Sequence, residues 1–245
     1  MIDILIAHRG EPESWPENSL AGYREVLRAG ARYIETDVQV TADGIPILSH
    51  DPSLLKITDH DQIVTDTPYA EIHSLPAGHP DRFGDRFLDL RIATLAEFAG
   101  LLAAWPDARA FVEIKHASIT AFGTGRVIDV MLETLAGVLD QCILISFEYA
   151  ALESVRKRSA LPVGWVVPHW DEDNRRRATD LAPDYLFVNR KRLPPLPAPL
   201  WEGPWQWVVY TVNRADEIGP LLERGFDMIE TNVIRSLLAG EGGHG

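Results

Sequence analysis

The chain has 245 residues, of which 46% are hydrophobic and 24% charged, a composition typical of a soluble globular protein with one large core or two small ones. Lys and Arg number 23 against 36 Asp and Glu, so the formal net charge is −13. This charge argues against a nucleic-acid partner and against a polybasic membrane surface. An anionic substrate must therefore meet a local cluster of Arg and Lys or a bound cation.

The cysteine content and the first residues exclude further classes of protein. Cys142 is the only cysteine, so an intramolecular disulfide and a thiolate metal cluster are excluded. Its apolar surroundings, CILISF, predict a buried side chain. The first ten residues, MIDILIAHRG, have no basic region and no long apolar region, so they do not form a signal peptide. No stretch reaches the ~18 apolar residues that a membrane helix needs. We expect a cytoplasmic protein with no stable membrane association.

Along the chain, short apolar runs alternate with longer segments of helical periodicity, which is typical of βα units around a parallel sheet. The predicted strands are Ile4–His8, Tyr33–Val40, Ala110–Lys115, Cys142–Phe147, Val163–Val167, Tyr185–Val188, Trp207–Val212 and Asp227–Glu230. The predicted helices are Ser19–Ala29, Leu95–Trp105, Gly125–Leu139, Tyr149–Lys157, Ala215–Arg224 and Val233–Ala239. Four prolines between 194 and 199 forbid a regular helix after the sixth strand.

Eight strands in this order predict an α/β fold, a closed (β/α)8 TIM barrel with its active site at the C-terminal mouth of the strands. An open doubly wound sheet is the alternative. It is weakened because no G-x-G-x-x-G pattern follows the first strand.

The region after the second strand departs from a plain barrel. Residues 38–50 read as a hairpin with an Asp43-Gly44 turn, which would leave His50 above the mouth. Residues 51–90 are polar and rich in turns, and they are too long for a simple loop. We expect one barrel domain over 1–240, with 51–90 as an inserted cap and 241–245 as a disordered tail.

Acidic side chains occur in the middle of two predicted strands. Glu35 and Asp37 are two residues apart, so their side chains lie on the same face of their strand. Glu113 and Lys115 have the same spacing on the next predicted strand. Carboxylates that converge in a barrel interior repel one another, and a divalent cation with oxygen ligands, Mg²⁺ or Ca²⁺, would offset this. The alternative is an internal network of ion pairs with Lys115 and Arg9.

Two histidines accompany these carboxylates. His8 shares an alternating face with Ile4 and Ile6, which places its imidazole at the mouth, and Asp51 beside His50 could orient an imidazole. A pair of histidines near a cation and cationic side chains can exchange the protons needed to split a phosphodiester. Patterns typical of zinc hydrolases, of a nucleophile elbow and of a P-loop are absent from the sequence.

The order of these motifs resembles the glycerophosphodiester phosphodiesterase family. The resemblance rests on HRG at 8–10, PENS at 16–19, ETD at 35–37, DGIPILSHD at 43–51, EIK at 113–115, SF at 146–147, YTVN at 210–213 and MIETN at 228–232. It spans nearly the whole chain and implies a metal-dependent phosphodiesterase on a (β/α)8 barrel with a small insertion after the second strand.

The resemblance also implies roles for single residues. Glu35, Asp37 and Glu113 would be the metal ligands for one divalent cation. His8 and His50 would be the acid/base pair, and Arg9 and Lys115 would hold the phosphate of a small glycerophosphodiester substrate. Asn18 would be either a further polar ligand or the N-cap of the first helix.

Several positions depart from the usual family pattern. These are Ser19, Tyr210 where Trp is usual, Asn232 where Asp is usual, the Lys56-Ile57-Thr58 run, and Ala93. None of them is expected to touch the proposed ligands or histidines, so they bear on the alcohol part of the substrate. Trp201, Trp205 and Trp207 form either an exposed apolar patch or part of the core.

The expected reaction is hydrolysis of a glycerophosphodiester to sn-glycerol 3-phosphate and an alcohol. One alternative is a lysophospholipase D-like or cyclising phosphodiesterase. The other, from a different class, is a non-catalytic barrel that only binds a phosphorylated ligand.

Overall fold

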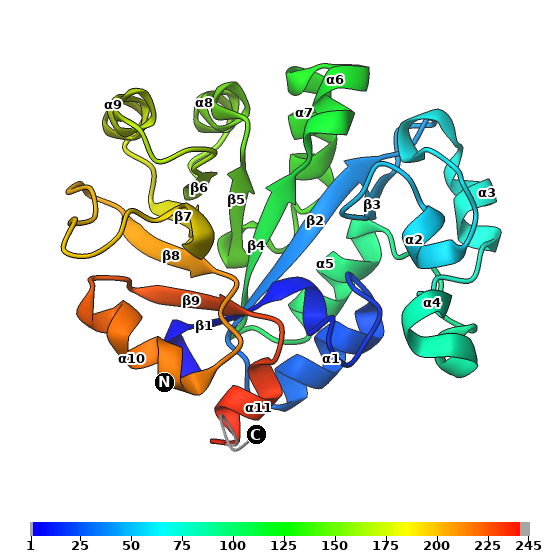
Figure 1. Cartoon of the computed structure of the whole chain (residues 1–245). Coiled ribbons are helices and arrows are strands. Elements are labelled where there is room, and N and C mark those ends of the chain that lie inside the picture. The colour runs from blue at the N-terminus through cyan, green and yellow to red at the C-terminus, as the bar shows by residue number, and fades with distance from the viewer. Residues whose placement is uncertain (1, 241–245) are drawn as a thin grey trace.

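The structure is a computed structural model and describes residues 2–240. Its centre is one sheet of nine strands, eight of them parallel and closed into a barrel by pairing of the first strand with both the second and the last (Figure 1). The strands are β1 (Leu5–Ala7), β2 (Tyr33–Val40), β3 (Pro46–Leu48), β4 (Arg109–Ile114), β5 (Cys142–Ser146), β6 (Val163–Val166), β7 (Tyr185–Asn189), β8 (Gln206–Tyr210) and β9 (Met228–Thr231).

The closed sheet confirms the (β/α)8 barrel and rules out the open doubly wound alternative. The closing pair is β1 with β2, where Ile6 lies opposite Tyr33. The first and last residues of the observed barrel strands differ from the predicted ones by two residues or fewer. The agreement is close because each strand coincides with an apolar run of the sequence. Cys142 is buried at the start of β5, as predicted.

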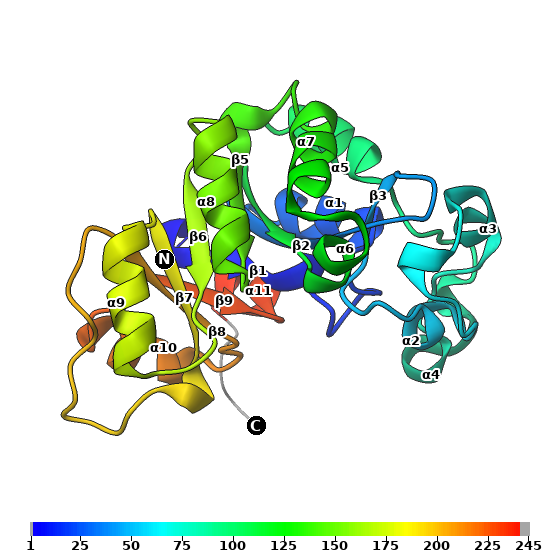
Figure 2. The same ribbon diagram turned by 90° about the horizontal axis from the view of Figure 1, so that it is seen from above.

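Helices surround the barrel and bury one face each against the strands (Figure 2). They are α1 (Leu20–Arg28), α5 (Leu95–Ala103), α6 (His116–Phe122), α7 (Thr124–Thr134), α8 (Tyr149–Arg158), α9 (Glu172–Leu181), α10 (Ala215–Glu223) and α11 (Ile234–Leu238). The predicted helix over 125–139 ends at Thr134, and α6 and α9 are not among the predicted helices. The α9 sequence is strongly polar and buries only Asn174, Ala178 and Leu181, so it shows little apolar periodicity.

Two apolar layers hold the barrel. One fills its interior and consists of Ile6, Phe111, Ile143, Ile145, Val166, Phe187, Val208 and Met228. The larger layer lies between the strands and the outer helices. Trp205 and Trp207 are buried in this outer layer, which confirms core packing for these two tryptophans, and Trp201 stacks on Trp170 at 4.4 Å between ring centroids.

The hairpin after β2 is present, with β3 antiparallel to β2 and Gly44 at φ +87° in the turn. The next segment forms the short helices α2 (Leu55–Thr58), α3 (Tyr69–Ser74) and α4 (Pro80–Phe83). They lie together beside β3, on one side of the barrel (Figures 1 and 2). A small apolar cluster of their own, which includes Leu54 and Ile72, holds them. A cap formed by residues 51–90 stays a prediction, and the predicted tail 241–245 lies outside the described residues.

None of the described helices has the length and apolar content needed to cross a membrane.

Candidate active site

The loop after β1 carries the first two candidate residues in an unusual backbone conformation. His8, Arg9 and Gly10 form a single 3₁₀ turn in which Arg9 has φ 49° and Gly10 has φ +73°. The Gly10 carbonyl lies against α1, and a Cβ on Gly22 would be 2.4 Å from the Gly10 oxygen. The two glycines therefore allow the loop to lie directly on the helix, which fixes where the His8 and Arg9 side chains leave the backbone.

Three of the predicted carboxylates meet at the mouth end of neighbouring strands. Asp37 on β2 lies opposite Glu113 on β4, and Glu35 lies two residues earlier on the same face of β2. One oxygen from each of the three carboxylates lies within 4.8 Å of the others, and all three residues are buried. The structure thus brings together the set that the strand spacing predicts.

Two cationic side chains pair with part of this cluster. Arg9 Nε lies 3.0 Å from Asp37 Oδ2, and Lys115 Nζ lies 3.2 Å from Asp37 Oδ1 and 2.9 Å from Glu113 Oε1. Burial alone would raise the pKa of Asp37, but Arg9 and Lys115 hold it well below its usual range. Asp37 is therefore a fixed negative charge, as the ion-pair alternative requires.

In the part of the chain that the structure describes, the ion pairs leave Glu35 without a cationic partner, and at Glu113 the pair with Lys115 does not offset the effect of burial. Among the described residues, the Glu35 carboxylate receives one hydrogen bond, from the backbone N–H of Arg9 at 3.3 Å. Burial, Asp37 and Glu230 hold the pKa of Glu35 well above its usual range, and burial raises the pKa of Glu113 to about 7. These shifts describe carboxylates that lack enough positive charge around them, which fits a cation site.

Asn18 is neither the N-cap of α1 nor a free ligand. The cap is Ser19, whose side chain accepts a hydrogen bond from the backbone N–H of Gly22, so the N-cap interpretation of Asn18 is wrong. The Asn18 amide donates to Asp37 Oδ2 at 2.9 Å, and its carbonyl oxygen accepts from the Tyr23 hydroxyl at 2.8 Å. Asn18 therefore orients the Asp37 carboxylate from behind.

Each candidate histidine has one ring nitrogen held by a neighbour. His8 Nδ1 lies 2.6 Å from Asn232 Oδ1, and His50 Nδ1 lies 2.8 Å from Asp51 Oδ1. In both rings this leaves Nε2 available for other contacts. Burial, with a contribution from Arg9, lowers the pKa of His8 to about 3, and burial also lowers the pKa of His50. Both imidazoles are therefore neutral at pH 7.

The contact between His8 and Asn232 corrects one expectation. Asn232 was expected to touch neither ligand nor histidine, yet it is the direct partner of His8. The two residues lie 224 positions apart in the chain and meet because β9 is the neighbour of β1 in the closed barrel. A second pair of residues 224 positions apart is joined in the same way. The backbone N–H of Arg235 donates to Glu11 Oε1 at 3.0 Å, and the two side chains form an ion pair.

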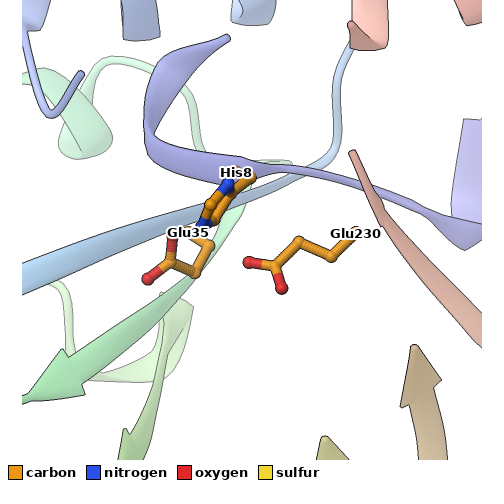
Figure 3. A group of neighbouring side chains, drawn as sticks. All are labelled: His8, Glu35 and Glu230. Atoms are coloured by element: carbon orange, nitrogen blue, oxygen red, sulfur yellow. The ribbon is translucent and has the colours of Figure 1, made fainter. Parts of the chain in front are cut away.

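Glu230 is a site residue that the sequence predictions missed. It lies on β9, only 4% exposed, and points into the same space as Glu35 (Figure 3). Burial raises its pKa to about 8, with Arg9 opposing and Glu113 adding to the shift. The signal was available, because Glu230 is an acidic residue in the middle of an apolar strand, the pattern that singled out Glu35 and Glu113.

These side chains line one cavity of about 110 Å³ at the barrel mouth. The lining combines charged and polar side chains with apolar and aromatic ones. The lining residues are His8, Arg9, Glu35, His50, Glu113, Glu230, Ile145, Phe147, Val166, Phe187 and Tyr210. Among the candidate residues, Asp37 and Lys115 stand directly behind this surface, where they pair with each other. The cavity can therefore offer an anionic substrate two imidazoles and a guanidinium beside a cluster of carboxylates.

The donor set fits a hard divalent cation. Glu35, Asp37 and Glu113 supply carboxylate oxygens alone, which is the chemistry that Mg²⁺ and Ca²⁺ prefer. Counting Glu230, four carboxyl groups face the two cationic side chains of Arg9 and Lys115, so two negative charges are left over when all four are ionised. One divalent cation would balance them.

Comparisons with known proteins agree with this geometry. The sequence matches the model of the Glycerophosphoryl diester phosphodiesterase family over residues 8–236. It is 28% identical over 244 residues to a glycerophosphodiester phosphodiesterase of Caldanaerobacter subterraneus subsp. tengcongensis, with 97% of each chain covered.

Solved structures share the fold. One is a phosphodiesterase from Oleispira antarctica in complex with the product sn-glycerol-3-phosphate, with TM-score 0.84, 23% identity and 97% and 96% of the two chains covered. Another is a glycerophosphodiester phosphodiesterase from Thermotoga maritima, with TM-score 0.70, 22% identity and 96% and 97% covered. Barrel and sequence thus lead to the same group of proteins.

Proposed function

The chain belongs to the glycerophosphoryl diester phosphodiesterase family and is a phosphodiesterase, and from that premise we propose that it hydrolyses glycerophosphodiesters with the help of a divalent cation and the pair His8 and His50. The products are sn-glycerol 3-phosphate and a free alcohol. The Oleispira relative binds sn-glycerol-3-phosphate as its product, which supports this choice of substrate.

The observation that carries the proposal is the convergence of unlike groups in one small cavity. Two neutral imidazoles, each with one nitrogen held in place, share the cavity wall with the Arg9 guanidinium and the carboxylates of Glu35 and Glu113. A site that only bound a phosphorylated ligand would have no need of two oriented, neutral proton carriers. A phosphodiester needs both, because one oxygen must lose a proton and another must gain one.

Glu35, Asp37 and Glu113 would hold the cation. A bound Mg²⁺ or Ca²⁺ would neutralise charge on the phosphoryl oxygens and polarise the phosphorus toward attack. Asn18 and Lys115 keep the Asp37 carboxylate in one orientation, so the ligand set is prearranged.

The chain's own residues account for the proton transfers. Arg9 lines the cavity and would hold the phosphate, and Lys115, which stands behind the cavity surface and pairs with Asp37, would add its positive charge. One imidazole Nε2 takes a proton from the attacking water as the new P–O bond forms. The other imidazole takes up a proton from solution when the anionic phosphodiester binds and gives it to the alkoxide as the old P–O bond breaks, after which the first imidazole returns its proton to solution. The sum is one diester and one water giving one monoester and one alcohol.

The test is a turnover assay after treatment with EDTA. We expect hydrolysis of glycerophosphocholine, glycerophosphoethanolamine, glycerophosphoglycerol or glycerophosphoinositol to disappear with EDTA and to return with Mg²⁺ or Ca²⁺. Activity that survives chelation would refute the metal assignment. A cyclic phosphate or an acylated glycerol phosphate among the products would favour the cyclising or lysophospholipase D-like alternative.

The acid/base assignment is tested by substitution. His8→Ala and His50→Ala should each lower kcat by about 10²-fold or more if each ring transfers a proton. His116→Ala is the matched control, because His116 is exposed, pairs with Glu148 and does not line the cavity. A histidine variant that keeps the activity of the control would lose its role.

A further inference from the structure

Glu230 is the one carboxylate of the cavity that the proposed reaction does not use. Within residues 2–240, no hydrogen bond and no ion pair reaches its side chain, although only 4% of the residue's surface is exposed. Its carboxylate points into the cavity toward His8 and Glu35 (Figure 3). A buried carboxylate without a partner is costly to ionise, so a positive group that enters the cavity from outside would stabilise its charged form.

The charge of the cavity limits what that group can be. One divalent cation balances the surplus of the four carboxylates over Arg9 and Lys115. A phosphodiester then adds one further negative charge to the cavity that Glu230 lines. A substrate whose alcohol carries a fixed positive charge is neutral as a whole, and it brings its own partner for Glu230.

The cavity that Glu230 lines also has the surface that such a group needs. Tyr210 on the neighbouring strand β8 lines the cavity together with Phe187 and Phe147. Tyr210 also lies close enough to Glu230 for the carboxylate to raise the pKa of the phenol, after the larger effect of burial. Aromatic rings beside a carboxylate are the usual recognition elements for ammonium groups.

We propose that Glu230, Tyr210, Phe187 and Phe147 form a subsite for an ammonium-bearing alcohol, so that the enzyme selects zwitterionic glycerophosphodiesters over anionic ones. This inference deepens the proposed function and rests on it for the reaction, but the subsite itself is defined by binding. Glu230 acts here as a specificity residue.

A second divalent cation is the rival occupant, because one atom each of His8, Glu35 and Glu230 lie within 4.8 Å of one another. Two features disfavour it. Apart from the Tyr210 phenol, the aromatic residues that line the cavity, Phe187 and Phe147, offer no oxygen ligands for a hard ion. Arg9, a fixed positive charge, is the main charge acting on Glu230. The stoichiometry of Mn²⁺ binding separates the two occupants.

The experiment compares kcat/KM for zwitterionic glycerophosphocholine and glycerophosphoethanolamine with anionic glycerophosphoglycerol and glycerophosphoinositol. We expect the wild type to prefer the zwitterions by at least about tenfold and Glu230→Gln to lose that preference by at least about tenfold, because the anionic substrates gain while the zwitterions lose. Tyr210→Phe, which keeps the ring, should retain the preference, and Tyr210→Leu should weaken it. A preference unchanged in Glu230→Gln would overturn the inference.

A binding measurement keeps the inference testable apart from catalysis. Choline should bind the Mg²⁺-loaded wild type, whereas its neutral isostere 3,3-dimethylbutan-1-ol should bind at least about tenfold more weakly, a contrast that Glu230→Gln removes. Equal binding of the two probes would overturn the inference even if hydrolysis is observed. Two Mn²⁺ ions per wild-type chain and one in Glu230→Gln would overturn it as well. Absence of hydrolysis with every substrate and ion, together with choline binding, would refute the proposed function alone.

Discussion

The contact between Gly10 and Gly22 makes a sharp prediction, because it links a helix residue to the catalytic loop. Gly22→Ala would place a Cβ 2.4 Å from the Gly10 carbonyl oxygen and 3.2 Å from the Cβ of Trp15. The nearer atom belongs to the backbone and cannot rotate away, so about 1 Å of extra separation must come from moving the loop that carries His8 and Arg9, since ordinary contacts lie near 3.5 Å.

The magnitude follows from two opposing effects. Overpacking of this kind costs about 1–3 kcal/mol, and replacing a helical glycine with alanine returns up to about 1 kcal/mol. We therefore expect the free energy of unfolding to fall by about 1–2 kcal/mol, which lowers Tm by about 2–8 °C in a chain of this length. Displacement of His8 and Arg9 by about 1 Å should also lower kcat by up to about 10²-fold.

The assay is thermal unfolding alongside turnover, with Gly100→Ala as the matched control. Gly100 lies on α5, and a Cβ there meets no atom within 4 Å, so this variant should gain up to about 1 kcal/mol and keep its activity. If Gly22→Ala is as stable and as active as Gly100→Ala, the loop does not depend on the contact and the reasoning is refuted.

Three further predictions concern the charges around the site. Asn232→Asp places a carboxylate beside His8 Nδ1, which should raise the pKa of His8 and move one limb of the kcat/KM profile to higher pH, the acid limb if His8 is the base and the alkaline limb if it is the acid; a profile with neither limb moved would contradict the contact. Since burial raises the pKa of Glu113 to about 7 and of Glu230 to about 8, both ionise at a cost as pH rises from 4.5 through 8, and the metal-free protein loses stability over that range. Saturating Mg²⁺ or Ca²⁺ should therefore raise Tm more at pH 8 than at pH 5.5, and equal shifts would argue against a carboxylate site. Asn18→Ala removes the acceptor of the buried Thr36 hydroxyl and of the Asp37 N–H and one of the donors to the Asp37 carboxylate, so chemical denaturation should show a loss of about 1–3 kcal/mol; an unchanged free energy of unfolding would show that none of these groups depends on the amide.

Much of the fold could be predicted because each barrel strand is a buried run whose ends are marked by polar residues. The same reasoning located Glu35 and Glu113, since a carboxylate in an apolar strand must face the mouth. It applied equally to Glu230, which was overlooked because the resemblance assigned no role to that position. The polar helix α9 shows where periodicity fails, since only three of its residues are buried.

Other parts of the site depend on contacts that no local pattern carries. Asn18 and Ser19 are both residue types that commonly cap helices, so the sequence does not tell which one does so here. In the structure the backbone of Asn18 has φ 58°, and its side-chain amide donates to Asp37. The partner of His8 could not be read from neighbouring residues, because Asn232 is brought to it by closure of the barrel.

That closure also determines when the protein becomes competent during its synthesis. The bonds from His8 to Asn232 and from Glu11 to Arg235 each span 224 positions, so a ribosome holding β9 and α11 in its exit tunnel presents a nascent chain whose first loop has neither partner. The entropic cost of joining residues so far apart rises only with the logarithm of the number of residues between them. The time at which the two contacts form therefore depends mainly on when β9 and α11 are translated. We expect partial translation products to be inert toward substrate, with activity gained in a single step once the final turns of the chain emerge.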